Sequence, residues 1–144
     1  MTSAASSTRF TSQELRYLAG QRLGRLATVQ RNGTLQNSPV GFHYNDDTET
    51  IDIVGFDMAG SQKFRNVAAN GKVAFVVDDV RSVRPWRVRC LEIRGYAEAV
   101  DPPERRAGVD GAIIRIHPTR IISFGLDDAD VDPHDLVADR RDVG

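Results

Sequence analysis

The chain has 144 residues, of which 40% are hydrophobic and 27% charged, a size and composition typical of one globular domain. Its formal net charge of −1 argues against a nucleic acid as the main partner, because such proteins usually carry a basic excess. No apolar run is long enough for a membrane-spanning helix, and a single cysteine excludes an internal disulfide. We therefore expect a cytoplasmic protein that binds neither nucleic acid nor membrane.

Composition divides the chain into three parts. Residues 1–10 are predicted to be a disordered N-terminal tail, because most of them are small and polar. Residues 11–125 are predicted to form one folded domain, without internal repeats or a dividing linker. Residues 126–144 contain seven aspartates and few apolar residues, which predicts a loosely packed acidic tail.

The first half of the domain predicts a short helix followed by three strands. A capping box at residues 11–14 starts the helix, which ends at Gly20. Asn32-Gly33 is the strongest short hairpin signal, and residues 45–48 form a second turn. The predicted strands around these turns are residues 24–30, 35–44 and 50–56.

The second half predicts one more helix and further strands. Ser61 can cap the helix, and Gly71 ends it. The predicted strands are residues 73–79, residues 87–100 with a bulge at Gly95, and residues 112–125, as one strand or as two separated near Pro118. Residues 78–79 are predicted to be a turn, and residues 101–111 a loop or a poorly formed helix. About six strands with few helices predict a mainly β fold, a small closed or half-closed antiparallel barrel.

The start of the second helix carries positive charge where acidic residues are usual. Lys63 and Arg65 are repelled there by the partial positive charge of the helix end, and residues 58–77 contain no Asp or Glu. One interpretation is that a phosphate lies against the capped turn at Ser61 and the two cations. The alternative is that Lys63 extends into water, which costs only roughly a few tenths of a kcal/mol.

Other candidate chemistry is weaker. The histidines share no metal-ligand spacing, so no metal site is predicted, and Cys90 is expected to be a buried small hydrophobe. The chain has no nucleophile elbow, dinucleotide fingerprint or Walker loop. Catalytic side chains therefore remain unknown, and an enzyme of this kind would take its chemistry from a cofactor.

Residues 81–94 are rich in arginine. Alternation along a strand puts Arg87 and Arg89 on one face and Val88 and Cys90 on the other. The arginines belong either to a solvated face, to ion pairs with the acidic tail of the same or a neighbouring chain, or to a groove for a polyanion. Trp86 is a candidate anchor of an interface.

Four segments in this order resemble the pyridoxamine 5′-phosphate oxidase-like split-barrel superfamily, and more closely its deazaflavin (coenzyme F420)-dependent reductases. They are RLATVQRNGTLQNSPVGFHY, IDIVG, SQKFRNVAANGKVAFVVDD and LEIRGYAEAV, and the resemblance covers residues 18–125. It implies a six-stranded antiparallel split β-barrel with a few short helices. It also implies a homodimer with two cofactors bound at its interface.

The resemblance implies which residues bind the cofactor. Lys63 contacts the cofactor phosphate, in agreement with the anion site above. Neighbouring residues that help are Ser61, Arg65 and Asn66. The segment beneath the tricyclic ring consists of Gln36, Asn37, Ser38, Pro39 and Val40. A separate hypothesis, which does not come from the resemblance, is that Trp86, Arg87 and Arg89 contact the cofactor tail or the second chain of the dimer.

The leading functional hypothesis is an F420H2-dependent oxidoreductase that transfers a hydride to a small organic acceptor, such as an unsaturated lactone, a quinone or a tetrapyrrole. The motifs with which pyridoxamine phosphate oxidases bind FMN and substrate are absent, so oxidation of vitamin B6 is not expected. FMN is the alternative cofactor, in an oxidoreductase of the same fold. A non-catalytic carrier or sensor of flavin, deazaflavin or haem is the remaining alternative.

Overall fold

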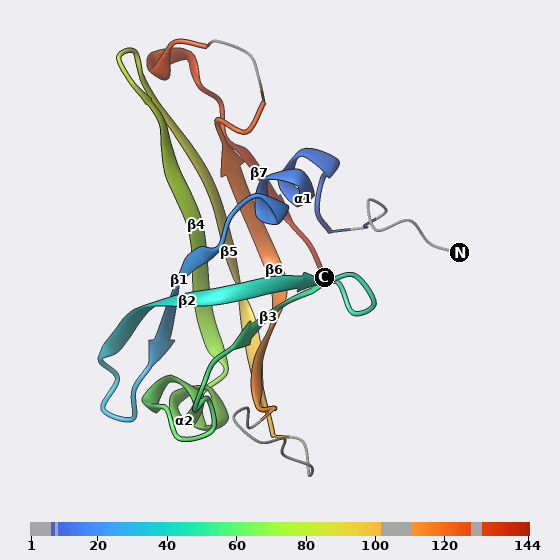
Figure 1. Cartoon of the computed structure of the whole chain (residues 1–144), viewed down its shortest axis with the longest axis vertical. Helices are drawn as coiled ribbons and strands as arrows, with labels where there is room; N and C mark the ends of the chain where they lie inside the picture. Colours follow the sequence, from blue (N-terminus) through green and yellow to red (C-terminus); the bar gives the residue numbers. More distant parts are fainter. Residues whose placement is uncertain (1–6, 8, 102–110, 128–130) are drawn as a thin grey trace.

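The computed structural model describes residues 7, 9–101, 111–127 and 131–144. Antiparallel strands dominate this part of the chain, with two α-helices and a 3-10 helix beside them (Figure 1). The elements in chain order are α1 (Ser12–Ala19), β1 (Leu23–Val29), β2 (Leu35–Asn45), β3 (Thr50–Val54), α2 (Gln62–Ala69), β4 (Lys72–Val83), β5 (Trp86–Val100), β6 (Ile113–Phe124), η1 (Pro133–Asp135) and β7 (Asp139–Asp142). None of the helices in these described ranges is long and apolar enough to cross a membrane.

The strands form a closed ring of six, with β7 added at the side of β6. Their order is β3-β2-β1-β4-β5-β6-β7, and an additional pairing of β3 with β6 closes the first six into a barrel. The edge of β6 that faces away from β5 pairs with two strands. Residues 113–116 pair with β3, and residues 120–123 pair with β7. The predicted mainly β split barrel is confirmed, and β7 adds a seventh strand that the sequence did not predict.

The hairpin that Asn32-Gly33 predicts is present between β1 and β2, although only Gly33 of the two residues has a positive φ. The Gln30 N–H donates to the Thr34 carbonyl at 2.8 Å, and the Gly33 N–H donates to the Gln30 carbonyl at 2.9 Å. Gly33 has a φ of 85°, in the left-handed region that glycine adopts without steric cost. This turn places Arg31 and Asn32 at the same end of the barrel as α2.

Two strands run further than their patterns indicate. Residues 78–79 lie within β4 and do not form a turn, because β4 continues to Val83 as one arm of a long hairpin with β5. β6 is one strand through Pro118, which lies opposite Gly95 at a shift of register. The irregularity predicted at Gly95 is therefore present, but the extra residue, Thr119, lies on β6 and not on β5. A Cβ at Gly95 would lie 2.0 Å from the His117 carbonyl oxygen. The predicted loop at residues 101–111 falls mostly outside the described residues.

Both predicted tails contain residues that pack against the barrel. Phe10, at the end of the predicted N-terminal tail, is buried, whereas residues 1–6 and 8 of that tail lie outside the described residues. In the predicted acidic tail, residues 139–142 form β7 and Val143 packs against the core. Loose packing is thus wrong for this end of the tail, because Arg141 of β7 bonds to the buried carboxylate of Glu14 in α1.

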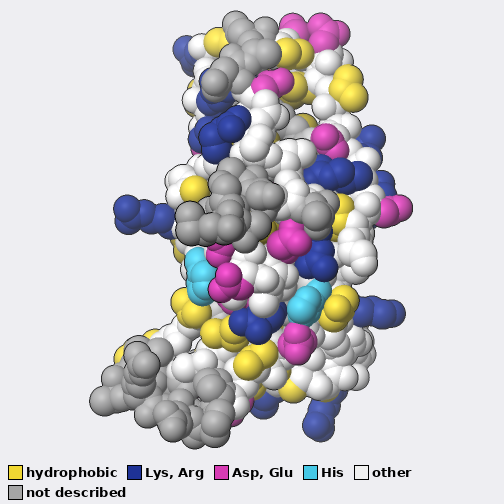
Figure 2. All heavy atoms as spheres, turned by 90° about the vertical axis from the view of Figure 1, so that its right-hand side faces the viewer, with side chains coloured by type: hydrophobic (Ala, Val, Ile, Leu, Met, Phe, Trp, Pro, Cys, Tyr) yellow, Lys and Arg dark blue, Asp and Glu magenta, His cyan; other side chains and the backbone are white. Residues whose placement is uncertain are grey.

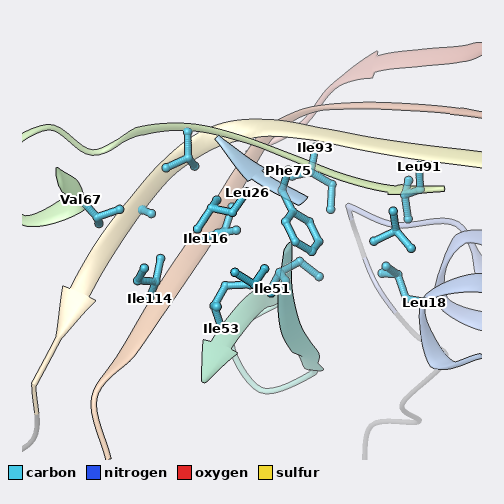
Figure 3. Packing of buried hydrophobic residues seen from close by; sticks show 14 of the residues in the cluster. Leu18, Leu26, Ile51, Ile53, Val67, Phe75, Leu91, Ile93, Ile114 and Ile116 are labelled. Carbon is cyan, nitrogen blue, oxygen red and sulfur yellow. The ribbon is translucent and has the colours of Figure 1, made fainter. Parts of the chain in front are cut away.

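The hydrophobic core fills the interior of the ring (Figure 3), and buried residues alternate with less buried ones along β1, β6 and the first half of β4. Ile51 and Ile53 of β3 face Phe75 of β4 across the barrel. Val67 of α2 and Leu18 of α1 lie at opposite ends of the cluster. Burying each of these side chains stabilises the fold by about 1.5–3 kcal/mol, so both helices are held against the barrel through their apolar faces.

Candidate functional site: a cationic groove beside an open sheet face

The first turn of α2 has the cap and the unbalanced charge that the sequence predicts. The Ser61 hydroxyl accepts from the Phe64 N–H at 3.3 Å, and the first turn contains no acidic residue. Lys63 is half-buried and has no hydrogen-bond or ion-pair partner among the described residues. Its ammonium group is therefore not neutralised by this part of the chain.

Arg65 stays close to the same turn. Its guanidinium donates to the Gly60 carbonyl at 2.7 Å and to the Gln62 Oε1 at 2.9 Å. These partners are neutral, so the positive charge of Arg65 is held in place without being cancelled.

A groove of about 830 Å³ lies between α2 and the β1–β2 turn. Its lining consists of Gln30, Arg31, Asn32, Gln62, Arg65, Asn66, Ala68 and Ala69. Two arginines and no acid line it, so the groove favours an anion. No local sequence pattern pointed to Arg31, because its approach to α2 depends on how the β1–β2 turn lies against the helix.

The charge distribution elsewhere differs from that of the groove. On the face that Figure 2 shows, Lys and Arg side chains are interspersed with Asp and Glu side chains. Elsewhere in the described structure, Arg115 pairs with the buried Asp52 at 3.1 Å. Compensation of this kind is the usual state of a protein surface, and the lining of the groove lacks it.

The five residues predicted to lie beneath the ring divide between the two faces of β2. Register with β1 places Asn37 opposite Ala27 and Pro39 opposite Arg25 on the outer face, where both are exposed. The inward side chains are those of Gln36, Ser38 and Val40. Only Asn37 and Pro39 could therefore touch a ligand on the outer face through their side chains.

One edge of β2 is open along this segment. β3 pairs only with residues 42–45 of β2, so residues 35–41 have a strand partner on the β1 side alone within the described structure. A proline fits such an edge, because it has no N–H to leave unpaired. The backbone groups that face away from β1 are available to a ligand.

The outer face beside this edge has a shallow depression of about 270 Å³. Its lining consists of Arg25, Ala27, Asn37, Ala74, Phe75, Val76 and Glu92. Its apolar lining comes from β1 and β4, and its polar lining consists of Arg25, Asn37 and Glu92. A flat aromatic group can lie against a floor of this kind.

Asn66 is the only predicted site residue of α2 that is fully buried. Its side-chain amide donates to Thr28 Oγ1 at 3.1 Å and to Gln36 Oε1 at 2.9 Å. Both N–H groups of the amide are thus used within the chain. A direct contact of Asn66 with phosphate stays a prediction, and the observed bonds join α2 to β1 and β2.

The arginines of β5 have partners in the chain. Arg89 donates to Asp79 Oδ1 at 2.9 Å and lies over the ring of Tyr17, with its guanidinium carbon 5.0 Å from the ring centre. Hydrogen bonds from Arg89, opposed by burial and helped by Tyr17, lower the pKa of Asp79. Arg87 donates to the carbonyl of Trp86 at 3.1 Å. Trp86 itself is exposed near the tip of the β4–β5 hairpin, so a role at an interface stays a prediction.

Cys90 and the histidines offer no metal-binding group. Cys90 is half-buried on β5, and burial with the nearby carboxylates of Asp78 and Glu92 raises the pKa of its thiol to about 11. His117 bonds to Glu98 and stacks on Tyr96 at 4.7 Å between ring centres. No three His, Cys, Asp or Glu side chains of the described residues lie close enough together to hold a metal ion.

Comparison with known proteins relates this geometry to a family. Residues 10–126 match the family described as pyridoxamine 5′-phosphate oxidase. A 5a,11a-dehydrotetracycline/5a,11a-dehydrooxytetracycline reductase of Streptomyces rimosus is 48% identical over 120 residues, which cover 82% of this chain and 84% of that protein.

Two solved structures share the fold. A protein described as an F420 reductase is 28% identical and superposes with a TM-score of 0.56, covering 72% of this chain and 91% of that one. A conserved hypothetical protein of Mycobacterium tuberculosis is 20% identical with a TM-score of 0.66, covering 88% of this chain and 91% of that one.

Proposed function

The chain belongs to the pyridoxamine 5′-phosphate oxidase family, and from this premise we propose that it is an F420H2-dependent reductase of a small organic acceptor. Its identity of 48% to a reductase of similar length supports an oxidoreductase of this fold and is the observation that carries the proposal. The likeness to a protein described as an F420 reductase supports the choice of cofactor.

The residues at α2 fit the phosphate of such a cofactor. Lys63 supplies a compact positive charge at a capped helix start, and Arg31 and Arg65 supply forked guanidinium donors around the adjoining groove. A charge-assisted bond to phosphate is worth about 1.5–3 kcal/mol. Binding of the phosphate would relieve the repulsion that these cations experience in the free protein.

The outer face of the sheet fits a flat ring. Ala27, Ala74 and Val76 offer small apolar contacts, and the open edge of β2 offers backbone donors and acceptors to the polar rim of the ring. These residues can orient the ring and exclude water from one of its sides, and none of them can exchange a proton. The cofactor, when bound, supplies a hydride, that is two electrons, and water supplies the proton that completes reduction of one double bond.

The name of the Streptomyces relative supports a proposal for the chemical class of the acceptor that this chain reduces. That protein is described as a reductase of dehydrotetracyclines, which are fused-ring compounds with an activated carbon–carbon double bond. We infer that this chain reduces a compound of the same class, since a shallow, open sheet face can take a second flat molecule on top of a bound ring.

A homodimer is part of the proposal. Large apolar side chains are exposed on the strands that form the outer face: Leu23, Leu35, Val80, Val83, Trp86 and Tyr96. A second copy of this chain placed on this face would cover these side chains and enclose the depression.

Anaerobic turnover tests the proposal. Purified protein is mixed with reduced F420 and 5a,11a-dehydrotetracycline, and the absorbance of oxidised F420 is followed with the appearance of the reduced acceptor. We expect both products to form in equal amounts. Turnover only with FMN and oxygen, with release of peroxide, would identify an FMN oxidase. Cofactor binding without any turnover would identify a carrier or sensor.

A further inference from the structure

A chain of amide side chains crosses the interior between α2 and β2. At its centre, the Asn66 amide accepts from Gln62 Nε2 at 2.7 Å and donates to Gln36 Oε1 at 2.9 Å. Its second N–H donates to Thr28 Oγ1 at 3.1 Å. From Gln36 the chain continues to Ser38 Oγ at 3.3 Å.

The other end of the chain reaches the first turn of α2. Gln62 Oε1 accepts from Arg65, whose guanidinium also donates to the carbonyl of Gly60, just before the cap at Ser61. A continuous series of hydrogen bonds thus runs from the loop that precedes Lys63 to the inward side chains of β2.

Burial makes the centre of this network rigid. Asn66 is 3% exposed and Thr28 is fully buried, so a displaced amide would lose its partners without gaining water. Both N–H groups and the oxygen of the Asn66 amide are satisfied in one arrangement. A shift of α2 along β2 would break at least one of these bonds.

The network joins the side chains of α2 and β2 through the bond from Asn66 to Gln36. The inward residues Gln36 and Ser38 alternate along β2 with Asn37 and Pro39, which border the outer face. The position of α2 relative to β2 therefore sets how far the cationic turn lies from the ring-binding edge.

We propose that Asn66 is a positioning residue, which holds Lys63 at the distance from β2 that the deazaflavin ring and its phosphate require. This inference rests on the proposed function. It assigns to Asn66 a role through α2 and β2, in place of the direct phosphate contact that the sequence suggested. The residue then determines selectivity for a cofactor in which ring and phosphate are joined.

Two ligands separate this role from a merely structural one. One is F420, and the other is its deazaflavin alcohol fragment, which carries the same ring without the phosphate and its tail. Fluorescence titration gives the dissociation constant of each ligand for the wild-type protein, Asn66→Ala, Lys63→Ala and the double variant. Gln36→Met is a second variant that cuts the β2 arm of the network and leaves the Asn66 bonds to Thr28 and Gln62.

We expect the wild-type protein to bind F420 about tenfold or more tightly than the fragment, because only F420 reaches Lys63. Asn66→Ala and Gln36→Met should each weaken the binding of F420 by about tenfold and change the affinity for the fragment by less than about twofold. The double variant should bind F420 no more weakly than Lys63→Ala alone, since both changes remove the same contact.

The possible contrary results point to different errors. If Asn66→Ala and Gln36→Met still prefer F420 to the fragment, Asn66 is not a positioning residue. The same holds if both variants lose affinity for both ligands in parallel with a drop in Tm. If Asn66→Ala does not fold, the result with Gln36→Met decides between these outcomes. If the wild-type protein binds both ligands equally or binds neither, the proposed function is wrong, and this inference is wrong with it.

Discussion

Asp52 shows at the scale of one residue how the barrel is closed. This carboxylate is almost fully buried on β3 and accepts from Arg115 of β6 at 3.1 and 3.2 Å. Burial raises the pKa of Asp52, but bonds from Arg115, Asn45 and Thr50 outweigh burial, and the pKa is lowered overall. The pair joins the two strands whose contact turns an open sheet into a ring.

The lowered pKa of Asp52 determines in which direction the stability of the fold changes with pH. The ionised Asp52 stabilises the fold fully above the pKa of the unfolded chain, about 3.9, and this contribution is lost as the pH falls through the lower folded pKa. We expect Asp52→Asn to lower the free energy of unfolding at pH 7 by about 3 kcal/mol, because Arg115 loses its partner. Urea denaturation of the wild-type protein and the variant at pH 7 and pH 3 measures the loss of unfolding free energy at pH 7 and the loss on acidification.

The exposed neighbour Asp47 provides the matched control for this prediction. Asp47→Asn should leave the unfolding free energy within about 0.5 kcal/mol of the wild-type value at both pH values. An Asp52→Asn variant that loses as much stability on acidification as the wild-type protein would contradict the assignment.

Residue-level sequence reasoning pointed to Lys63 as a candidate for phosphate binding, but not to the hydrogen-bond partners of Asn66. The unbalanced charge of Lys63 is visible locally, because acids are missing from residues 58–77. Two of the three partners of Asn66, Gln36 and Thr28, lie 30 and 38 residues away in the chain. A buried amide network is a tertiary feature, and its polar residues look in the sequence like any exposed helix face.

At the scale of elements, α1 and β7 are joined by one carboxylate with two functions. Glu14 completes the capping box by accepting from the Thr11 N–H at 3.0 Å. The same carboxylate is 1% exposed and accepts from Ser123 at 2.7 Å and from Arg141 at 3.0 Å. The start of α1 and the end of the chain therefore stabilise each other.

We predict that Arg141→Met lowers the free energy of unfolding by about 3 kcal/mol, because it leaves the Glu14 carboxylate buried without its cation. Arg140→Met, at the exposed neighbouring position of β7, should change it by less than about 0.5 kcal/mol. Denaturant titration of both variants measures the difference. Equal losses would show that Arg141 contributes no more than its exposed neighbour.

The two helices and the β1–β2 hairpin were readable from the sequence, whereas β7 was not. Capping residues and Asn-Gly act within a few residues, so their patterns report the local structure directly. β7 has the sequence DRRD and no apolar alternation. Its position depends on pairing with β6 and on the bond from Arg141 to Glu14, 127 residues apart in the chain.

At the scale of the whole molecule, strand count and turns predicted a closed or half-closed barrel, but not which strands close it. The pairing of β3 with β6 joins segments separated by α2, β4 and β5, so no local pattern indicates it. The division of residues 36–40 between two faces follows from alternation, once the register with β1 is known.

The same outer face that carries the depression is expected to form the homodimer. We predict that the wild-type protein sediments as a species of twice 15.9 kDa at micromolar concentration. Trp86→Asp, on the β4–β5 hairpin, should shift it toward the monomer, because a charge replaces an exposed apolar anchor. Val137→Asp, at an exposed apolar position outside the barrel strands, serves as the control. A monomeric wild-type protein, or an equal effect of both variants, would contradict this interface.

The central claim, that the cationic turn of α2 binds a deazaflavin phosphate, is tested most directly by fluorescence titration of the protein with F420 and with FMN. Lys63→Ala is compared with Lys72→Ala, which removes the other lysine of the same acid-free segment. We expect Lys63→Ala to weaken the binding of F420 by about tenfold or more, and Lys72→Ala to weaken it by less than about twofold. The wild-type protein should bind FMN more weakly than F420. Unchanged F420 affinity in Lys63→Ala would contradict the claim.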